Sequence, residues 1–150
     1  MRFRFRGVTL IEMVVVIVII GLLASIAVPT YRNHVLRANR GAARAALLAL
    51  ATAQEKFYLQ CNTYTTALNE TKDTACSPAN LKFPTSSERG YYTLAVTAAD
   101  ASAWTATTIA VSGNAQANDA PCRVFQLTST GAKTASKSGG AANDLDCWSR

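Results

Sequence analysis

Charged residues and histidine are scarce in this chain. Lys, Arg, Asp and Glu make up 16% of its 150 residues, against about 25% in typical soluble domains, and the one histidine is His34. The sequence has no Cys-x-x-Cys pair, no phosphate-binding glycine loop and no metal-ligand cluster. These absences argue against an enzyme, against a zinc site and against a bound cofactor.

The few charges are unevenly placed along the chain. The net charge is +6, and all of it lies in the first 60 residues, because residues 61–150 contain seven basic and seven acidic side chains. A nucleic-acid-binding head would carry an excess of positive charge. We therefore expect no nucleic-acid partner. A local basic patch at Lys133 and Lys137 is the one feature of the head that would support such a partner.

One long apolar run lies near the N-terminus. Residues 13–28 carry no charge, but as a helix they span only about 24 Å, short of the roughly 30 Å hydrocarbon core of a bilayer. A helix that starts at Val8 spans about 31 Å and can cross. It then includes Glu12, and a carboxylate in a membrane segment is costly unless it is paired. We therefore predict a membrane helix over residues 8–28 and a function for Glu12.

A secretory signal peptide is the competing interpretation of this segment. The basic start, the apolar run and the small residues at 25–27 fit a signal peptide with its cleavage site. However, helical periodicity continues beyond Pro29, because one face of residues 35–60 collects apolar side chains. These are Leu36, Ala43, Leu47, Leu50 and Phe57. We expect one long helix, bent at Pro29 and softened at Gly21.

All four cysteines lie in the C-terminal region, at Cys61, Cys76, Cys122 and Cys147. An even number outside Cys-x-x-Cys pairs indicates structural disulfides and an oxidising compartment. Of the three possible connectivities, Cys61–Cys76 with Cys122–Cys147 would close the two long loops directly. We therefore expect the globular part to lie outside the cytoplasm.

The N-terminal motif resembles that of type IV pilins. Gly7-Val8-Thr9-Leu10-Ile11-Glu12 follows a short basic leader and precedes an aliphatic run that ends at Pro29. The resemblance implies that a prepilin peptidase cuts after Gly7 and methylates Val8, where the family usually has Phe. It also implies that Glu12 neutralises the terminal amine of a neighbouring subunit. A buried carboxylate and a buried ammonium are each costly alone and much less costly together.

Three segments of the head are predicted to form strands, with a short fourth after a turn at Gly131. They are 91–98, 104–112, 123–128 and 133–135. Leu94 and Val96 supply the apolar face of the first strand, and Ile109 and Val111 supply that of the second. An antiparallel sheet of three or four strands needs a cover, which the apolar face of the helix provides. We expect five aromatic residues to fill the core, namely Phe57, Tyr58, Tyr91, Tyr92 and Trp104.

Short motifs in the head resemble minor pilins of the PilE type. They lie at residues 54–58, 62–64, 127–134 and 147–148. The resemblance implies the α+β type IV pilin fold, with a leader (1–7), a transmembrane and assembly helix (8–28), an amphipathic helix (29–60) and a disulfide-stapled head (61–150).

The same resemblance implies a minor type IV pilin, a structural subunit that promotes pilus assembly and twitching motility. Before assembly it would sit in the inner membrane with its head in the periplasm, and afterwards in the pilus at the cell surface. Its partners would be other major and minor pilins, the prepilin peptidase, the inner-membrane assembly platform and the lipid bilayer.

Other roles stay open at this point. The chain could be a major pilin, a DNA-uptake pilin, or a pseudopilin of type II secretion. A pseudopilin would need a calcium loop, for which Asp144 and Asp146 are a weak candidate that we interpret as solvated. A secreted binding module would have a mature N-terminus at Val28 rather than at Val8.

Overall fold

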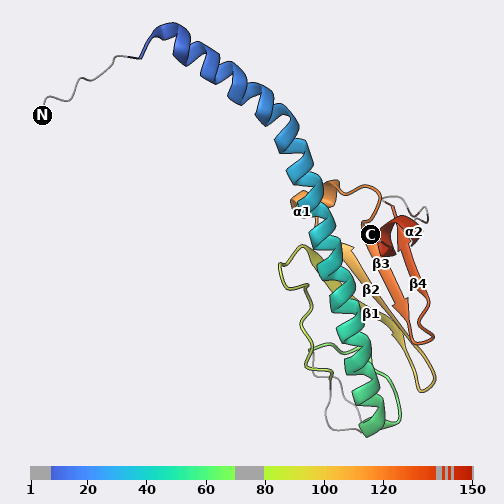
Figure 1. Cartoon of the computed structure of the whole chain (residues 1–150). Coiled ribbons are helices and arrows are strands. Elements are labelled where there is room, and N and C mark those ends of the chain that lie inside the picture. The colour runs from blue at the N-terminus through green and yellow to red at the C-terminus, as the bar shows by residue number, and fades with distance from the viewer. Residues whose placement is uncertain (1–7, 70–79, 138–139, 141, 143, 150) are drawn as a thin grey trace, which may run out of the picture. The chain divides into compact units, whose positions relative to one another are not determined.

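The computed structural model describes residues 8–69, 80–137, 140, 142 and 144–149. Its elements follow one another in the order shown in Figure 1. They are α1 (Leu10–Cys61), β1 (Tyr92–Ala99), β2 (Trp104–Ala110), the 3-10 turn η1 (Ala115–Asn118), β3 (Val124–Thr128), β4 (Lys133–Ser136) and α2 (Asp144–Trp148). The chain divides into two compact units, Met1–Val35 and Leu36–Arg150.

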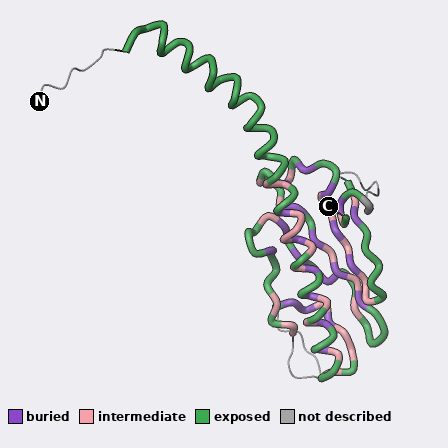
Figure 2. Tube along the Cα trace, in the orientation of Figure 1, coloured by how far each residue is buried: buried purple, intermediate pink, exposed green. Residues whose placement is uncertain are grey.

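The N-terminal unit consists of the first half of α1. The helix begins at Leu10 and continues through Pro29, and its apolar side chains are exposed along the whole run (Figure 2). It is long and apolar enough to cross a membrane. A Cβ added at Gly21 would meet nothing within 4 Å, so no close approach requires glycine there. A bend at Pro29 and softness at Gly21 stay predictions.

The second unit packs the rest of α1 on a four-stranded sheet (Figure 1). The strands follow the order β1-β2-β3-β4, and every neighbouring pair is antiparallel. Each predicted strand is present, with ends within two residues of the expected ones. Gly131, at φ +79°, provides the left-handed residue of the turn between β3 and β4. The α+β fold class predicted from the sequence is therefore confirmed.

The core lies between α1 and one face of the sheet. Ala43, Leu47, Leu50 and Phe57 are buried on α1 as predicted, while Leu36 is half-buried. On the sheet, alternate residues of β1, β2 and β3 are buried (Figure 2), and β4 buries Ala135. The inward aromatic residues are Tyr92, Trp104 and Phe125. Of the five aromatics expected in the core, Tyr58 and Tyr91 are only half-buried.

The predicted apolar face of β2 is wrong. Trp104, Ala106, Thr108 and Ala110 face the core, whereas Ile109 is 49% exposed. Strand residues alternate between faces, so Trp104 and Ile109 cannot both be buried. Trp104 removes more apolar surface from water than Ile109 does, and it sets the register of β2. Val111 lies beyond the end of the strand.

Candidate assembly surface

The N-terminal motif forms a helix cap. Thr9 immediately precedes the first residue of α1, and its hydroxyl Oγ1 accepts a hydrogen bond from the Glu12 backbone N–H at 3.3 Å. A threonine at the N-cap with a glutamate three residues later is the capping-box pattern, which satisfies amide groups that the first turn leaves unpaired. Thr9 thereby fixes where α1 begins and holds Glu12 in its first turn, where a helix favours negative charge.

The Glu12 carboxylate is available to a partner. It is exposed on the helix, and within the described residues no hydrogen bond or ion pair engages it. The surrounding side chains are apolar and exposed, including Leu10 at 82% and Ile11 at 68%. A lone carboxylate on such a surface can be buried at low cost only against a cation. Val8 is also exposed, and Gly7 lies outside the described residues.

The hydroxyls near Pro29 are satisfied within the helix. Ser25 Oγ donates to the Leu22 carbonyl at 2.7 Å, and Thr30 Oγ1 donates to the Ile26 carbonyl at 3.0 Å. Hydroxyls bonded back to the preceding turn expose little unsatisfied polarity to lipid or to a neighbouring helix. This part of α1 is therefore compatible with an apolar environment despite its polar residues.

The tail, here Cys147 and Trp148 of α2, is fastened to the rest of the head. Cys122 and Cys147 form a disulfide, the pairing predicted for this loop. Trp148 donates from Nε1 to the Thr134 carbonyl at 2.8 Å, and its own carbonyl accepts from Arg44 of α1 at 2.6 Å. The Trp148 ring also meets Phe125 edge to face, with centroids 5.7 Å apart. The tail thus links β3, β4 and α1.

The second predicted disulfide joins Cys61 to Cys76, and the structure describes only Cys61. Cys61 is disulfide-bonded, and Cys76 lies outside the described residues. Asp144 and Asp146, weighed above as a calcium loop, belong to the short helix α2 rather than to a loop. In the part of the chain that the structure describes, no group of three or more His, Cys, Asp and Glu side chains could hold a metal ion.

A buried ion pair joins α1 to Asp119, the residue that directly follows the turn η1. Arg40 binds both carboxylate oxygens of Asp119, at 2.7 and 2.6 Å, and Asp119 is 1% exposed. The hydrogen bond to Asp119 raises the pKa of Arg40 further above its ordinary value, so the pair stays charged.

Neutral polar groups extend this ion pair. Gln116 donates from Nε2 to Asp119 at 2.7 Å and to the Tyr92 hydroxyl at 2.9 Å, and its Oε1 accepts from Asn39 at 3.1 Å. Burial raises the pKa of Tyr92, so this phenol remains a neutral donor, to the Cys122 carbonyl at 3.1 Å. Asn39, Gln116 and Asp119 are each at most 1% exposed. We call these five residues, Asn39, Arg40, Tyr92, Gln116 and Asp119, the buried polar cluster.

Sequence reasoning missed the buried polar cluster, although one signal was available. Asn39 and Gln54 fall on the same face of α1 as Ala43, Leu47 and Leu50, where a polar residue must find a partner. Gln54 finds one in Thr65, donating to its carbonyl at 2.6 Å. Polar residues on an apolar helical face therefore predict buried hydrogen bonds, but not their partners.

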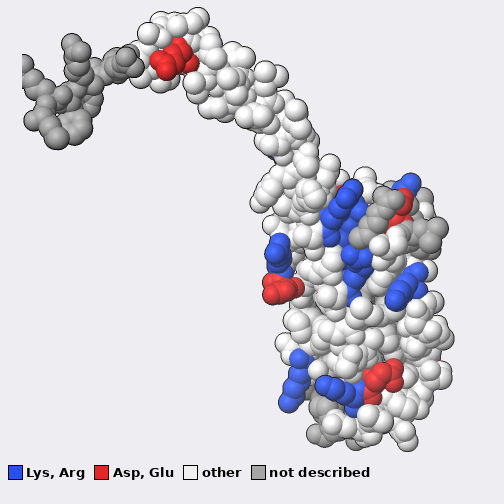
Figure 3. Space-filling view, viewed as in Figure 1, with Lys and Arg blue, Asp and Glu red and all other residues white. Residues whose placement is uncertain are grey.

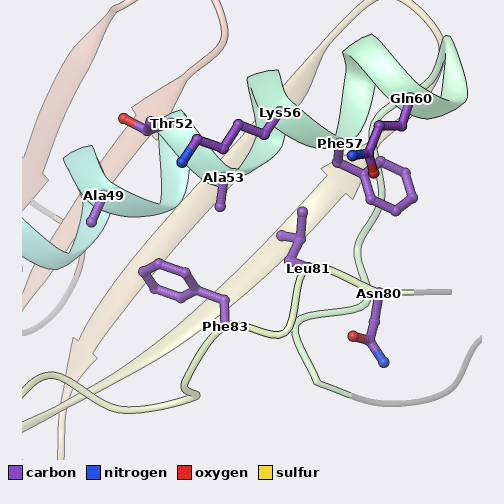
Figure 4. Close-up of a pocket in the computed structure, with 9 residues that line it drawn as sticks. All are labelled: Ala49, Thr52, Ala53, Lys56, Phe57, Gln60, Asn80, Leu81 and Phe83. Atoms are coloured by element: carbon purple, nitrogen blue, oxygen red, sulfur yellow. The ribbon is translucent and has the colours of Figure 1, made fainter. Parts of the chain in front are cut away.

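The surface of the second unit has a basic region and a small hollow. Lys and Arg side chains gather in the upper part of the head face drawn in Figure 3. On α1, a hollow of about 360 Å³ lies beside Ala53, Lys56 and Phe57. Leu81 and Phe83 point toward the helix from the facing segment (Figure 4).

Comparison with known families identifies this architecture. A family model described as "Type IV minor pilin ComP, DNA uptake sequence receptor" matches residues 29–126. A model of the prokaryotic N-terminal methylation motif matches residues 2–28. The chain belongs to the type IV pilin family. Pilins are structural subunits that assemble with other pilins, and this pilin is anchored in a membrane by its apolar helix.

Several individual proteins resemble this pilin over part of its length. The major pilin protein PilA of Myxococcus xanthus is 42% identical over 67 residues, which are 45% of this chain and 30% of PilA. Type II secretion system core protein G of Pectobacterium carotovorum is 40% identical over 62 residues, 41% of this chain and 40% of that protein. This pilin therefore spans well under half the length of these curated relatives.

The solved structure of a pilin shows the same fold. The Neisseria meningitidis non-core minor pilin PilV aligns over 70% of this chain and 90% of its own, with a TM-score of 0.50 and 21% identity. At that identity the likeness concerns the fold alone.

Proposed function

We propose that this protein is a minor type IV pilin, a structural subunit that promotes pilus assembly and twitching motility. The observation that carries the proposal is the match of residues 29–126 to a minor-pilin model. That stretch contains most of the head, where pilins differ, whereas any pilin supplies an apolar helix such as residues 8–28. A subunit that primes a helical polymer is needed in few copies, because nucleation is the unfavourable step.

The geometry suggests how such a subunit would enter a fibre. Cleavage after Gly7 by the prepilin peptidase would make Val8 the methylated N-terminus, four residues before Glu12. In the inner membrane, with the head in the periplasm, the exposed apolar face would contact lipid. At the assembly platform that face would contact other pilins, and Glu12 would pair with a neighbour's terminal amine. The pair favours one register between subunits rather than raw stability.

Deleting the gene tests this proposal. We expect surface pili and twitching motility to fall strongly, while unassembled major pilin accumulates in the membrane. A chain with Gly7→Val restored to the deletion strain should stay full length and fail to rescue, because the peptidase needs a residue without a side chain at its cut. Normal pili with a loss of protein secretion would contradict the proposal and favour the pseudopilin role of the Pectobacterium relative.

DNA uptake is the second candidate function. The matching family model is described as a DNA uptake sequence receptor, and this observation favours the role despite the neutral net charge of residues 61–150. Electrophoretic mobility shifts of duplex DNA by the full chain in detergent, at two salt concentrations, test it. A receptor should discriminate between sequences, and its affinity should fall steeply with salt. No shift at low salt would remove this candidate.

A further inference from the structure

Two shallow hollows flank Tyr31 at the end of the apolar run, both within the N-terminal unit. The first, of about 460 Å³, is lined by Ala27, Val28, Tyr31 and Arg32. The second, of about 620 Å³, is lined by Leu23, Ile26, Ala27, Thr30, Tyr31 and His34. Each hollow therefore passes from apolar side chains to a polar end that carries a nitrogen group, Arg32 in one and His34 in the other.

The side chains at the polar ends have no partner within the described part of the chain. Tyr31 is 71% exposed, and Arg32 and His34 are also exposed. No hydrogen bond, ion pair or ring contact joins any of the three to another described residue. Arg40 and Arg44 differ, because they bind Asp119 and the Trp148 carbonyl. Arg32 is the first arginine after the apolar run that ends at Val28. Its guanidinium is exposed and available to a ligand.

We propose that Tyr31, Arg32 and His34 form a collar that binds an acidic phospholipid while the subunit is in the membrane. An acyl chain would lie in the apolar part of a hollow, and the phosphate would meet the Arg32 guanidinium. Planar guanidinium groups bind phosphate oxygens in pairs, and tyrosines gather at the level of the headgroups. An anionic headgroup fits because the ammonium group of a zwitterionic lipid would repel Arg32.

The position of Arg32 in the chain supports this assignment. The apolar run ends at Val28, so Arg32 lies one turn beyond it, where a helix leaving the hydrocarbon meets the headgroups. Three arginines of the leader also precede the run. Positive charge at both ends weakens the charge bias that orients a membrane helix. An acidic lipid at the collar neutralises Arg32 and fixes the depth of the helix until the subunit enters a fibre.

Lipid selectivity of the reconstituted full chain tests the proposal. The chain is placed in phosphatidylcholine vesicles at low salt with a trace of spin-labelled phosphatidylglycerol or spin-labelled phosphatidylcholine. Electron paramagnetic resonance then gives the fraction of each lipid that the protein immobilises. We expect the wild type to prefer phosphatidylglycerol by about two- to fivefold. Arg32→Gln should lower this ratio to the smaller preference that the leader arginines supply, and Arg32→Lys should retain part of the difference. A ratio that Arg32→Gln leaves unchanged would assign the preference to the leader and overturn the proposal.

A matched variant separates a local collar from general attraction. Lys56→Gln removes one positive charge from an exposed position of α1 in the second unit, and the leader arginines are the same in every variant. This control should keep the wild-type ratio. Equal immobilisation of both lipids by the wild type, or an equal loss in Lys56→Gln, would overturn the proposal. It rests only on the apolar helix lying in a bilayer, so its failure would leave the pilus-assembly tests unaffected.

Discussion

At the residue scale, Thr9 and Glu12 act together at the start of α1. The Thr9 hydroxyl caps the helix through the Glu12 amide, and the Glu12 carboxylate stays exposed on an apolar surface. One short motif therefore defines both the first turn of the helix and the position of its charge. Thr9 is a positioning residue in this account, and Glu12 is the group that meets a partner.

Substitutions at these two residues should have different effects. Glu12→Val removes an unpaired charge, so the free subunit should remain in the membrane at normal levels while its share of sheared fibres falls. Thr9→Ala should reduce incorporation into fibres less than Glu12→Val does, because it removes only a helix cap, whose loss typically costs about 1 kcal/mol. Thr9→Ser keeps a capping hydroxyl and should restore incorporation. Immunoblots of membrane and fibre fractions measure both. Wild-type amounts of the Glu12→Val subunit in fibres would refute the pairing.

The Arg40–Asp119 pair should be costly to break from one side. Asp119→Ala leaves a largely buried guanidinium without its counter-charge, and we expect a loss of about 3–5 kcal/mol in unfolding free energy. Replacing both partners, with Arg40→Met and Asp119→Leu, should recover part of this, because Gln116 still loses the hydrogen bond that it donates to Asp119. Arg37→Ala, at an exposed position of the same helix, is the matched control and should change stability little. Denaturant titration in detergent measures the unfolding free energy of each variant. A loss in Asp119→Ala as small as that in Arg37→Ala would contradict a stabilising role of the buried pair.

Asp100 makes the folding stability of the protein depend on pH in the acidic range. Its Oδ1 accepts from the Ser102 hydroxyl and from the backbone N–H groups of Ser102 and Ala103, at 2.7, 2.6 and 2.8 Å. These hydrogen bonds lower the pKa of Asp100 below its ordinary value of 3.8, and the two bonds from Ser102 have a larger effect than the bond from Ala103. A lowered pKa means that this stabilisation is full above the unfolded pKa and is lost as pH falls through the folded one. The melting-temperature gap between wild type and Asp100→Ala should therefore shrink below pH 4, and a gap that does not change with pH would refute this.

At the element scale, the disulfide between Cys122 and Cys147 closes the tail on the sheet. Its loop spans 25 residues, and closing a loop of that size stabilises by roughly 3 kcal/mol in the chain-entropy model. Trp148 then binds Thr134 and Arg44, so the loss of the bridge should free both contacts.

Peptide mapping without reduction tests the arrangement of the cysteines. We expect Cys122 joined to Cys147 and Cys61 joined to Cys76. A double change of Cys122 and Cys147 to Ser should lower the melting temperature and raise hydrogen exchange near Trp148 in particular. Crossed pairs, or free thiols in protein taken from the cell surface, would contradict both the head layout and the oxidising compartment.

The long helix and the four strands were predictable from the sequence to within a few residues, whereas the short elements η1 and α2 were not. Alternation gave the four strands, and apolar spacing gave the helical face, because both patterns depend on neighbours in the chain. The inward face of β2 was not predictable in this way, since Trp104 and Ile109 compete for burial and only the packing decides. The buried polar cluster was also beyond reach, because Asn39 and Arg40 meet partners 77 and 79 residues away.

At the scale of the whole molecule, family membership and role rest on different parts of the chain. The methylation motif and the apolar helix make the protein a membrane-anchored pilin. The proposed minor role rests on the head, whose fold is held together from within by the buried polar cluster, the disulfide and the fastened tail.

The abundance of the protein in fibres tests this account most directly. Pili sheared from wild-type cells are digested, and the molar ratio of this protein to the main subunit is measured by quantitative mass spectrometry with isotope-labelled peptides. The account predicts that this protein is present at a small fraction of the main subunit, with methylated Val8 as its N-terminus. If it is instead the most abundant protein in the fibre, or absent from it, the assignment as a minor pilin is wrong.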